Sequence, residues 1–303
     1  MFARRSTLWA FILVVLCWGF TYAMVKMALA YAPPILFASL RMFVGGAAMT
    51  LIALFVGGRV DFRKTWPIFL ISSIVNALLF IGLQSFSLVY LPSGLAAVLV
   101  YTQPILVGLM AWLWLGEGLS PGKVTGLVLG FLGVIAVSLD RMGGAISLVG
   151  ILLGFGAGLS WALGTIYLKK IEGKVPILWL SGVQLIIGGL LLLPLALGLE
   201  SWSDISWTLP FWLGLLYAGL IGAALAWFLW AYIVKSGEAS RVSSYMFAVP
   251  FVSVLFGVLA LNEPFGLNLL LGALLILAGI YLSNRRQTPA PQPVAHPGKT
   301  PTA

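Results

Sequence analysis

The sequence has little of what soluble proteins and metalloenzymes depend on. Charged residues make up 8% of the 303 residues, whereas a soluble domain carries roughly 25%, so a soluble fold is excluded. The single cysteine, Cys17, cannot form an intramolecular disulfide. With one histidine, His296, in addition, we expect no His/Cys metal site and no cofactor.

Acidic residues are also scarce, and their positions matter more than their number. The chain has 8 Asp and Glu residues, and none lies in the middle of a long apolar segment. Hydrolysis or phosphoryl transfer needs acids, histidines or metal ligands gathered at one face, so we expect that the protein is not an enzyme. A proton relay through a mid-membrane acid is disfavoured for the same reason. Glu117 and Glu263 fall at helix ends, where we interpret them as capping carboxylates.

Long apolar segments dominate what remains. Hydrophobic residues make up 61% of the chain and the mean hydropathy is +1.08. A membrane-spanning helix needs roughly 20 apolar residues. The sequence therefore predicts an all-α membrane protein with ten transmembrane helices. We place them at 8–30, 34–57, 67–90, 93–115, 120–139, 148–169, 175–197, 210–235, 239–261 and 265–283.

The chain reads as one unit used twice. Trp18, Pro33 and Arg41 recur 143 residues later as Trp161, Pro176 and Gln184, and Lys26 matches Lys169. Later landmarks recur at an offset of 146, namely Pro104, Glu117, Gly126 and Gly133 with Pro250, Glu263, Gly272 and Gly279. Each copy holds five spans, so the second copy is inverted in the membrane. We expect a first repeat at 1–142, a second, inverted repeat at 143–284 and a disordered, Pro-rich cytoplasmic tail at 285–303.

The basic residues predict the orientation. Lys and Arg in short loops and at helix ends mark the cytoplasmic side. With the N-terminus inside, the outer loops hold only Arg141, and Lys26 and Arg41 fall within helices. The inner segments hold Arg4, Arg5, Arg59, Arg63, Lys64, Lys123, Lys169, Lys170, Lys174, Lys235, Arg241, Arg285, Arg286 and Lys299. We therefore predict a multi-pass protein of a bacterial or archaeal plasma membrane with both termini cytoplasmic, and the net charge of +9 needs no nucleic-acid partner.

The order and spacing of these landmarks resemble a known family. Residues 77–139 place an alanine-containing helix pair before Pro104, then the motif LWLGEGL, then a glycine-rich helix. The second copy has Pro250, LALNEPF, Gly272 and Gly279 in the same order, with Asn262 in place of the first copy's glycine. Over roughly 8–283, the chain is similar to the ten-helix, two-repeat EamA-type permeases of the drug/metabolite transporter superfamily. The resemblance implies a bundle around a central cavity, and export of small metabolites as the commonest role.

One charge lies deep in the predicted membrane region. Arg41 is about eight residues into its helix, roughly 12 Å down at ~1.5 Å per residue, and a lone charge there costs about 2.5 kcal/mol or more. It therefore needs a cavity, a partner or reachable headgroups, and snorkelling with backbone hydrogen bonds is the alternative. Polar and aromatic groups near mid-depth are the other candidates for substrate binding, with packing as the alternative. The candidate set is Trp18, Tyr22, Arg41, Asn76, Tyr101, Gln103, Trp161, Gln184, Trp227 and Tyr245; Gln84 and Ser244 lie at similar depth.

Two prolines are candidate hinges. Pro104 and Pro250 each lie about a dozen residues into their spans. A proline inside a helix removes a hydrogen bond and bends the helix, which in lipid is tolerated only where neighbours or a watery cavity satisfy the freed carbonyl. We expect both to bend their helices beside a central cavity, with a packing kink as the alternative.

Together these features predict a secondary transporter, because rocking one inverted repeat against the other exposes a central site to each side in turn. If Arg41 faces the cavity, amino acids or related carboxylate-bearing solutes are the expected cargo, and export is the expected direction. The expected partners are a small-molecule substrate and the lipid bilayer. The alternatives are a channel, a membrane-embedded enzyme, and a non-transporting membrane subunit or lipid flippase or scramblase. The sequence does not indicate the oligomeric state.

Overall fold

The computed structural model describes residues 5–91, 93–139, 147–261 and 266–285. In these ranges all regular secondary structure is helical, and ten helices are long and apolar enough to cross a membrane. The predicted fold class is confirmed. Residues 286–303 of the expected tail, and Glu263, lie outside the described residues.

Six of the ten spans are continuous helices. They are α1 (Arg5–Ala28), α2 (Pro34–Val56), α7 (Pro121–Ser138), α8 (Leu148–Lys170), α9 (Ile177–Leu199) and α14 (Leu267–Asn284). A short helix, η3 (Trp202–Asp204), lies in the connection after α9. The start of the third span differs from expectation, because its helix begins at Phe62 and not near residue 67. Phe62 packs on Phe69 and Trp179, with ring centroids 5.5 and 5.3 Å away, and these contacts draw part of the expected loop into the helix.

The other four spans are composite, and they are the third and fourth of each repeat. The third consists of α3 (Phe62–Ser72), η1 (Ser73–Leu79) and α4 (Phe80–Tyr90), and the fourth of α5 (Ser93–Val100) and α6 (Gln103–Leu115). The eighth consists of α10 (Leu209–Leu216), η4 (Tyr217–Leu225) and α11 (Ala226–Lys235). The ninth consists of α12 (Ala239–Ser244), η5 (Tyr245–Phe247) and α13 (Ala248–Leu261).

The interruptions also fall at repeat-equivalent positions. Both η1 and η4 are π-helical, and they lie 144 to 146 residues apart. Such wide turns are rare and are frequent at functional sites. In the fourth span the break comes at Tyr101–Thr102, two or three residues before Pro104, and in the ninth span it comes at the 3₁₀ turn η5, three to five residues before Pro250. Each proline therefore lies in the first turn of a new helix, where a missing N–H is tolerated. Their role as hinges stays a prediction.

The broken fourth span is supported by the opposite repeat. The Thr102 hydroxyl donates a hydrogen bond of 2.7 Å to the carbonyl of Leu99. Gly158 of α8 packs so closely that a Cβ there would lie 2.9 Å from the carbonyl oxygens of both Leu99 and Val100. A larger residue on α8 would force the break apart, so Gly158 fixes the position of this interruption.

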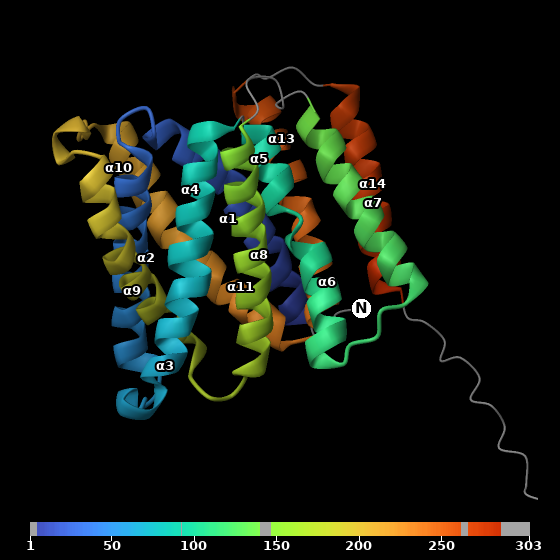
Figure 1. Ribbon diagram of the computed structural model, residues 1–303, viewed down its shortest axis with the longest axis horizontal. Coiled ribbons are helices and arrows are strands. Elements are labelled where there is room, and N and C mark those ends of the chain that lie inside the picture. The colour runs from blue at the N-terminus through green and yellow to red at the C-terminus, as the bar shows by residue number, and fades with distance from the viewer. Residues whose placement is uncertain (1–4, 92, 140–146, 262–265, 286–303) are drawn as a thin grey trace, which may run out of the picture.

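Repeat-equivalent helices pack in pairs. α7 lies beside α14 at one lateral edge of the bundle, and α2 lies beside α9 at the opposite lateral edge (Figure 1). A Cβ on Gly126 would lie 2.6 Å from the Gly279 carbonyl oxygen, and one on Gly279 would lie 2.6 Å from that of Gly126. Gly133 and Gly272 approach each other in the same reciprocal way, at 2.8 Å. Such reciprocal contacts are those expected of a two-fold axis that relates the two halves.

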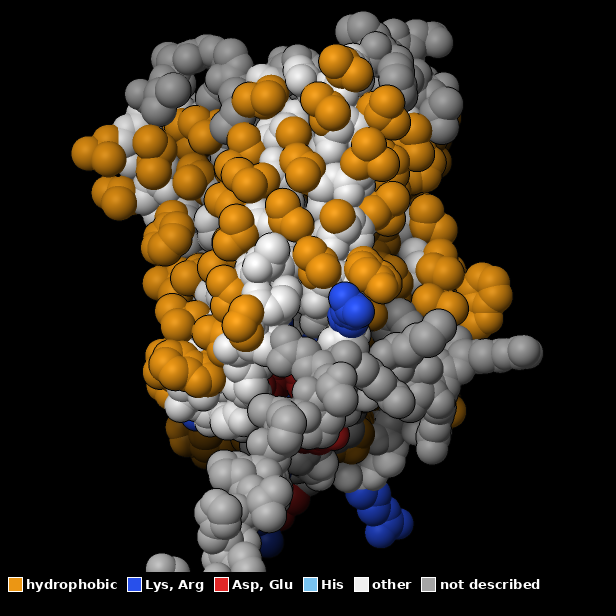
Figure 2. All heavy atoms as spheres, turned by 90° about the vertical axis from the view of Figure 1, so that its right-hand side faces the viewer, with side chains coloured by type: hydrophobic (Ala, Val, Ile, Leu, Met, Phe, Trp, Pro, Cys, Tyr) orange, Lys and Arg blue, Asp and Glu red, His pale blue; other side chains and the backbone are white. Residues whose placement is uncertain are grey.

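The outer surface of the bundle is that of a membrane protein. Figure 2 shows the lateral face of the bundle formed by α7 and α14. Hydrophobic side chains cover this face over most of its height, and charged side chains lie toward its lower part. Leu132 of α7 and Leu277 of α14 are 46% and 64% exposed. An apolar surface of this extent is stable in contact with lipid and not with water.

Candidate functional site

A central cavity of about 100 Å³ lies between the two repeats. Its walls come from α1, α2 and α4 of the first repeat and from η4 and α11 of the second, with Tyr101 and Trp161 completing them. The described lining residues are Trp18, Thr21, Val25, Leu29, Pro34, Phe37, Ala38, Arg41, Phe80, Ile81, Gln84, Ser85, Leu88, Tyr101, Trp161, Gly222, Ala223 and Trp227. Leu29 and Pro34 flank the α1–α2 connection, so the cavity extends from the centre toward the end of the bundle predicted to be outside.

Aromatic rings close the other end of the cavity. Trp18 and its repeat counterpart Trp161 meet edge to face, with ring centroids 5.5 Å apart. Trp227 and Trp230 of α11 lie 5.7 and 6.0 Å from Trp18. We call these four side chains the tryptophan cluster. Phe80 and Tyr101 extend it, at 5.2 and 5.9 Å from Trp161. Edge-to-face packing of this kind adds about 0.5–1.5 kcal/mol per pair beyond burial.

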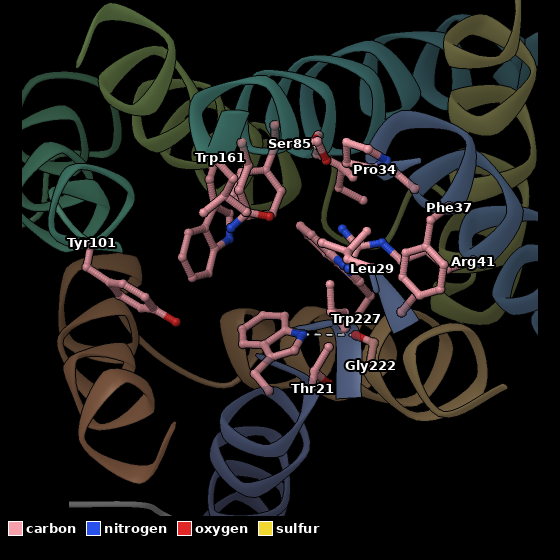
Figure 3. Close-up of a pocket in the computed structure, with 18 residues that line it drawn as sticks. Thr21, Leu29, Pro34, Phe37, Arg41, Ser85, Tyr101, Trp161, Gly222 and Trp227 are labelled. Carbon is pink, nitrogen blue, oxygen red and sulfur yellow. Dashed lines mark hydrogen bonds between the residues drawn. The ribbon is translucent and has the colours of Figure 1, made fainter. Parts of the chain in front are cut away.

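The two repeat-related tryptophans differ in their hydrogen bonds. The Trp18 indole N–H donates to the carbonyl of Gly222 in η4 at 3.0 Å, which Figure 3 draws as a dashed line. The Trp161 indole nitrogen is buried and has no hydrogen-bond partner among the described residues. A buried donor without a partner costs about 1–3 kcal/mol. Trp161 therefore brings a hydrogen-bond donor to the lining of the cavity that the described protein atoms leave unused.

Arg41 brings a positive charge to the same cavity. It lies on α2 one turn before Gly45, whose absent side chain allows η4 to approach; a Cβ there would lie 2.5 Å from the Gly219 carbonyl oxygen. The Arg41, Trp161 and Trp227 side chains are directed toward one common space (Figure 3). Arg41 is charged, and none of the described residues that line the cavity is acidic. The lining thus combines one cation with aromatic walls.

Five of the ten candidate residues line this cavity: Trp18, Arg41, Tyr101, Trp161 and Trp227. Four others lie elsewhere in the bundle. The Gln103 side-chain amide donates to the Thr165 hydroxyl at 3.2 Å, Asn76 packs against Gly164 of α8, Gln184 is buried within α9, and the Tyr245 ring lies 4.5 Å from that of Phe11. The Tyr22 side chain lies outside the described residues. A role for any of the ten in substrate binding stays a prediction.

Several contributors to the site were missing from the candidate set. Trp230 lies three residues after Trp227 and so shares its helix face, a spacing that could have identified it. Gln84 has only its depth in the membrane as a signal in the sequence. Phe80 and the Gly222 carbonyl had no signal in the sequence, since one is an ordinary apolar residue and the other is a backbone group within the π-helical segment η4 that accepts the Trp18 hydrogen bond.

On the side of the bundle away from the cavity, polar contacts hold the repeats together. Gly116 caps the C-terminus of α6 with a left-handed φ of 69°, a conformation that favours glycine. The carboxylate of Glu117 then accepts hydrogen bonds from the backbone N–H groups of Ala239 and Ser240 at 2.5 and 3.0 Å and from the Ser240 hydroxyl. Glu117 therefore caps α12 of the second repeat, and its interpretation as a capping carboxylate is confirmed.

A buried lysine extends this set of contacts. The Lys123 ammonium, on a side chain only 5% exposed, pairs with Glu238 at 2.9 Å and donates to the Ser240 hydroxyl at 2.9 Å. Arg241 also pairs with Glu238, at 2.9 Å. We call Glu117, Lys123, Glu238, Ser240 and Arg241 the inner polar network. It joins the end of α6 and the start of α7 to the start of α12.

A second capping carboxylate, Glu200, acts near the opposite end of the bundle. It follows α9 and accepts hydrogen bonds from the backbone N–H groups of Ile35 at 3.0 Å and Leu36 at 2.7 Å, at the start of α2. The sequence showed only an acidic residue in an outer loop. Carboxylates at helix N-termini are stabilised by the unpaired N–H groups and by the helix dipole.

The described residues contain no group of three or more His, Cys, Asp or Glu side chains that could hold a metal ion. What they do contain is a cavity at the centre of ten membrane spans, enclosed by two inverted repeats and lined by a cation and aromatic rings. This combination defines the class of multi-pass membrane transporters.

The family comparison agrees with this class and gives it a name. The EamA-like transporter family matches residues 5–139 and 148–285. The chain belongs to that family, as the resemblance in its sequence indicated, and to the drug/metabolite transporter superfamily. Membership implies a small-molecule substrate and a location in the lipid bilayer, and it indicates a transporter rather than an enzyme.

Three relatives illustrate the likeness. The chain is 44% identical over 283 residues to the uncharacterized transporter YvbV of Bacillus subtilis (strain 168), covering 93% of this chain and 92% of that protein. It is 26% identical over 290 residues to a probable amino-acid metabolite efflux pump of Escherichia coli (strain K12), covering 90% and 92%. A solved structure, titled only as the crystal structure of a protein, matches with a TM-score of 0.81 at 21% identity over 93% of this chain and 97% of that one, which supports the fold.

Proposed function

We propose that this transporter exports small carboxylate-bearing solutes, amino acids or related metabolites, across a bacterial cytoplasmic membrane by alternating access between its two repeats. The observation that carries the proposal is the lining of the cavity. Arg41 contributes a positive charge to it, and none of its described lining residues is acidic. The aromatic walls provide a surface for the apolar part of a solute.

The electrostatics favour an anionic group over a cationic one. Attraction between unit charges grows as the surrounding dielectric falls, and a cavity between apolar helices has a lower dielectric than water. A guanidinium also fits a carboxylate with two parallel hydrogen bonds. The Trp161 indole N–H, without a partner among the described residues, is a further donor for the same carboxylate. A protonated amine placed here would be repelled by Arg41, and the described lining residues offer it no carboxylate.

The name of one relative supports the direction and the substrate class. The relative from E. coli bears the name of a probable amino-acid metabolite efflux pump. The cavity extends toward the end of the bundle that the basic residues predict to be outside, which fits one of the two states of alternating access. The orientation itself, with both termini cytoplasmic, and the division into units 1–142 and 143–284 belong to this proposal.

The test is counterflow of labelled solutes in vesicles that contain the purified protein. Each carboxylate solute is compared with the amine that lacks its carboxyl group, so that the two differ in one charged group. We expect exchange of the carboxylate solute and little exchange of the amine. Arg41→Gln should reduce exchange by tenfold or more, on the order of the loss of a charged hydrogen-bonded pair, and Arg41→Lys should reduce it less. Arg59→Gln, which removes an exposed loop charge, is the matched control.

Two outcomes would contradict the proposal. One is full exchange by Arg41→Gln in folded protein; the other is a preference of the native protein for amines. Movement of labelled lipid between leaflets of the same vesicles, without solute exchange, would instead support the alternative of a lipid flippase or scramblase. Absence of both activities would support a non-transporting subunit.

A further inference from the structure

The two repeats are equivalent in their framework and different at their centre. Gly126 and Gly279 approach each other reciprocally, as do Gly133 and Gly272. Each third span carries a π-helical segment, and each meets a glycine of the other repeat: Gly45 of α2 contacts Gly219 of η4, and Gly188 of α9 contacts Ala77 of η1. The framework therefore has two equivalent helix contacts, one of α2 with η4 and one of α9 with η1.

Of these two contacts, only that of α2 with η4 borders the cavity among the described residues. Arg41 lies one turn before Gly45 and lines it, whereas Gln184 lies one turn before Gly188 and is 5% exposed. No described residue of α9 lines the cavity. The central tryptophans differ in the same sense, since Trp18 donates to η4 at 3.0 Å and Trp161 has no described partner. One sequence unit thus has two arrangements in one molecule: its α2 position, Arg41, is open to the cavity, and the equivalent α9 position, Gln184, is enclosed.

We propose that Gln184 takes the place of Arg41 when the two repeats exchange these conformations, so that the site carries a positive charge while it faces outward and a neutral amide while it faces inward. The inference rests on the proposed alternating access. In the inward-facing state a cavity opens beside η1 toward the cytoplasm, and the Gln184 amide becomes a polar group of its lining. Arg41 is then enclosed as Gln184 is enclosed now.

This difference in charge makes binding depend on the direction that the site faces. A carboxylate meets a guanidinium from outside and only an amide from inside, so the outward-facing state binds it more tightly. A ligand shifts a conformational equilibrium only by its difference in affinity between the two states. A carboxylate solute loaded from the cytoplasm therefore favours the turn toward the outside. We expect the half-saturation concentration to be on the order of tenfold lower on the outer side, equivalent to about 1.4 kcal/mol.

The first test measures access to each position and needs no substrate. In a Cys17→Ala background, which removes the single cysteine, Arg41→Cys and Gln184→Cys are exposed to a membrane-impermeant maleimide in intact cells and in inverted vesicles. We expect Arg41→Cys to react from outside and Gln184→Cys to react from inside. Leu190→Cys, 54% exposed on the surface of α9, is the lipid-facing control and should react from neither side. Reaction of Gln184→Cys from outside, or from neither side in vesicles that still transport, would overturn the inference.

The second test measures sidedness with the carboxylate solute. Gln184→Arg should lower the inner half-saturation concentration about tenfold and leave the outer one unchanged. The combined Arg41→Gln and Gln184→Arg exchange should reverse which side binds more tightly. An unchanged inner value in folded Gln184→Arg would contradict the inference. If the native protein carries no carboxylate solute, the proposed substrate class fails, and the labelling test still decides whether Gln184 faces inward.

Discussion

The two ends of the membrane core are built differently. Toward the predicted outside, the cavity lies between α1, α2 and α4 of the first repeat and η4 and α11 of the second. Toward the predicted inside, the tryptophan cluster closes the core and the inner polar network joins α6 and α7 to α12. The open end is lined mainly by apolar side chains, while the closed end is fastened by hydrogen bonds and ion pairs. If the repeats alternate as proposed, we expect the inner polar network to contribute to the barrier to opening inward, and single substitutions can test each of its contacts.

Removal of Glu117 should have the largest effect. Glu117→Ala leaves the N–H groups of Ala239 and Ser240 without their carboxylate, and we expect a loss of about 2–3 kcal/mol in the free energy of unfolding. It should also increase reaction of Gln184→Cys from the inner side. Thermal unfolding of the purified protein and maleimide labelling measure the two effects.

Glu200→Ala is the matched variant near the other end of the bundle. Glu200 caps α2 as Glu117 caps α12, so the stability loss should be similar. Because Glu200 joins the paired helices α2 and α9 and not the closed inner end, inner labelling should not rise. Equal inner labelling of Gln184→Cys in the two variants would show that the inner polar network does not keep the inner end closed.

Substitution of Lys123 should have an intermediate effect. Lys123→Met removes the pair with Glu238 and the hydrogen bond to Ser240. Glu238 is 40% exposed and keeps Arg241 as a partner, which limits the cost to about 1–2 kcal/mol. Inner labelling should rise less than in Glu117→Ala. A larger rise would place the main inner contact at Lys123.

Substitution of Lys169 should have the smallest effect. Its ammonium pairs with Glu172 at 3.0 Å and donates to the Lys235 carbonyl at 3.4 Å, linking the ends of α8 and α11. Both partners are partly exposed to solvent, so Lys169→Met should cost less than about 1 kcal/mol. Thermal unfolding at low and high salt checks this, because a solvent-screened contact loses its contribution as salt rises. A loss above that of Lys123→Met would contradict the ranking.

The duplication made much of the fold predictable. Trp18 and Trp161, separated by one repeat length, do meet at the centre, and Arg41 does line the cavity. The site was harder to predict because both the lipid-facing and the core-facing sides of these helices are apolar. Hydrophobic periodicity therefore gives no orientation, and Gln103, Asn76 and Gln184 could not be distinguished from cavity residues by depth alone.

Other features had no local signal. The π-helical segments η1 and η4 coincide with tertiary contacts, such as that of Gly188 with Ala77, and residue propensities do not encode them. Glu200 looked like an ordinary loop acid because its partners, Ile35 and Leu36, lie 165 and 164 residues away. Long-range contacts of this kind require the fold to be known first.

The π-helical segment η4 affects which way the two halves of the eighth span face. A π turn holds one residue more than an α turn, and one residue corresponds to about 100° of rotation around a helix. The extra residue lets Gly219 lie against α2 while Gly222, Ala223 and Trp227 lie along the cavity. Loss or gain of a single residue in η4 would rotate α11 relative to α10 and move Trp227 out of register with Trp18. In the eighth span, the number of residues in η4 therefore sets the direction in which α11 faces.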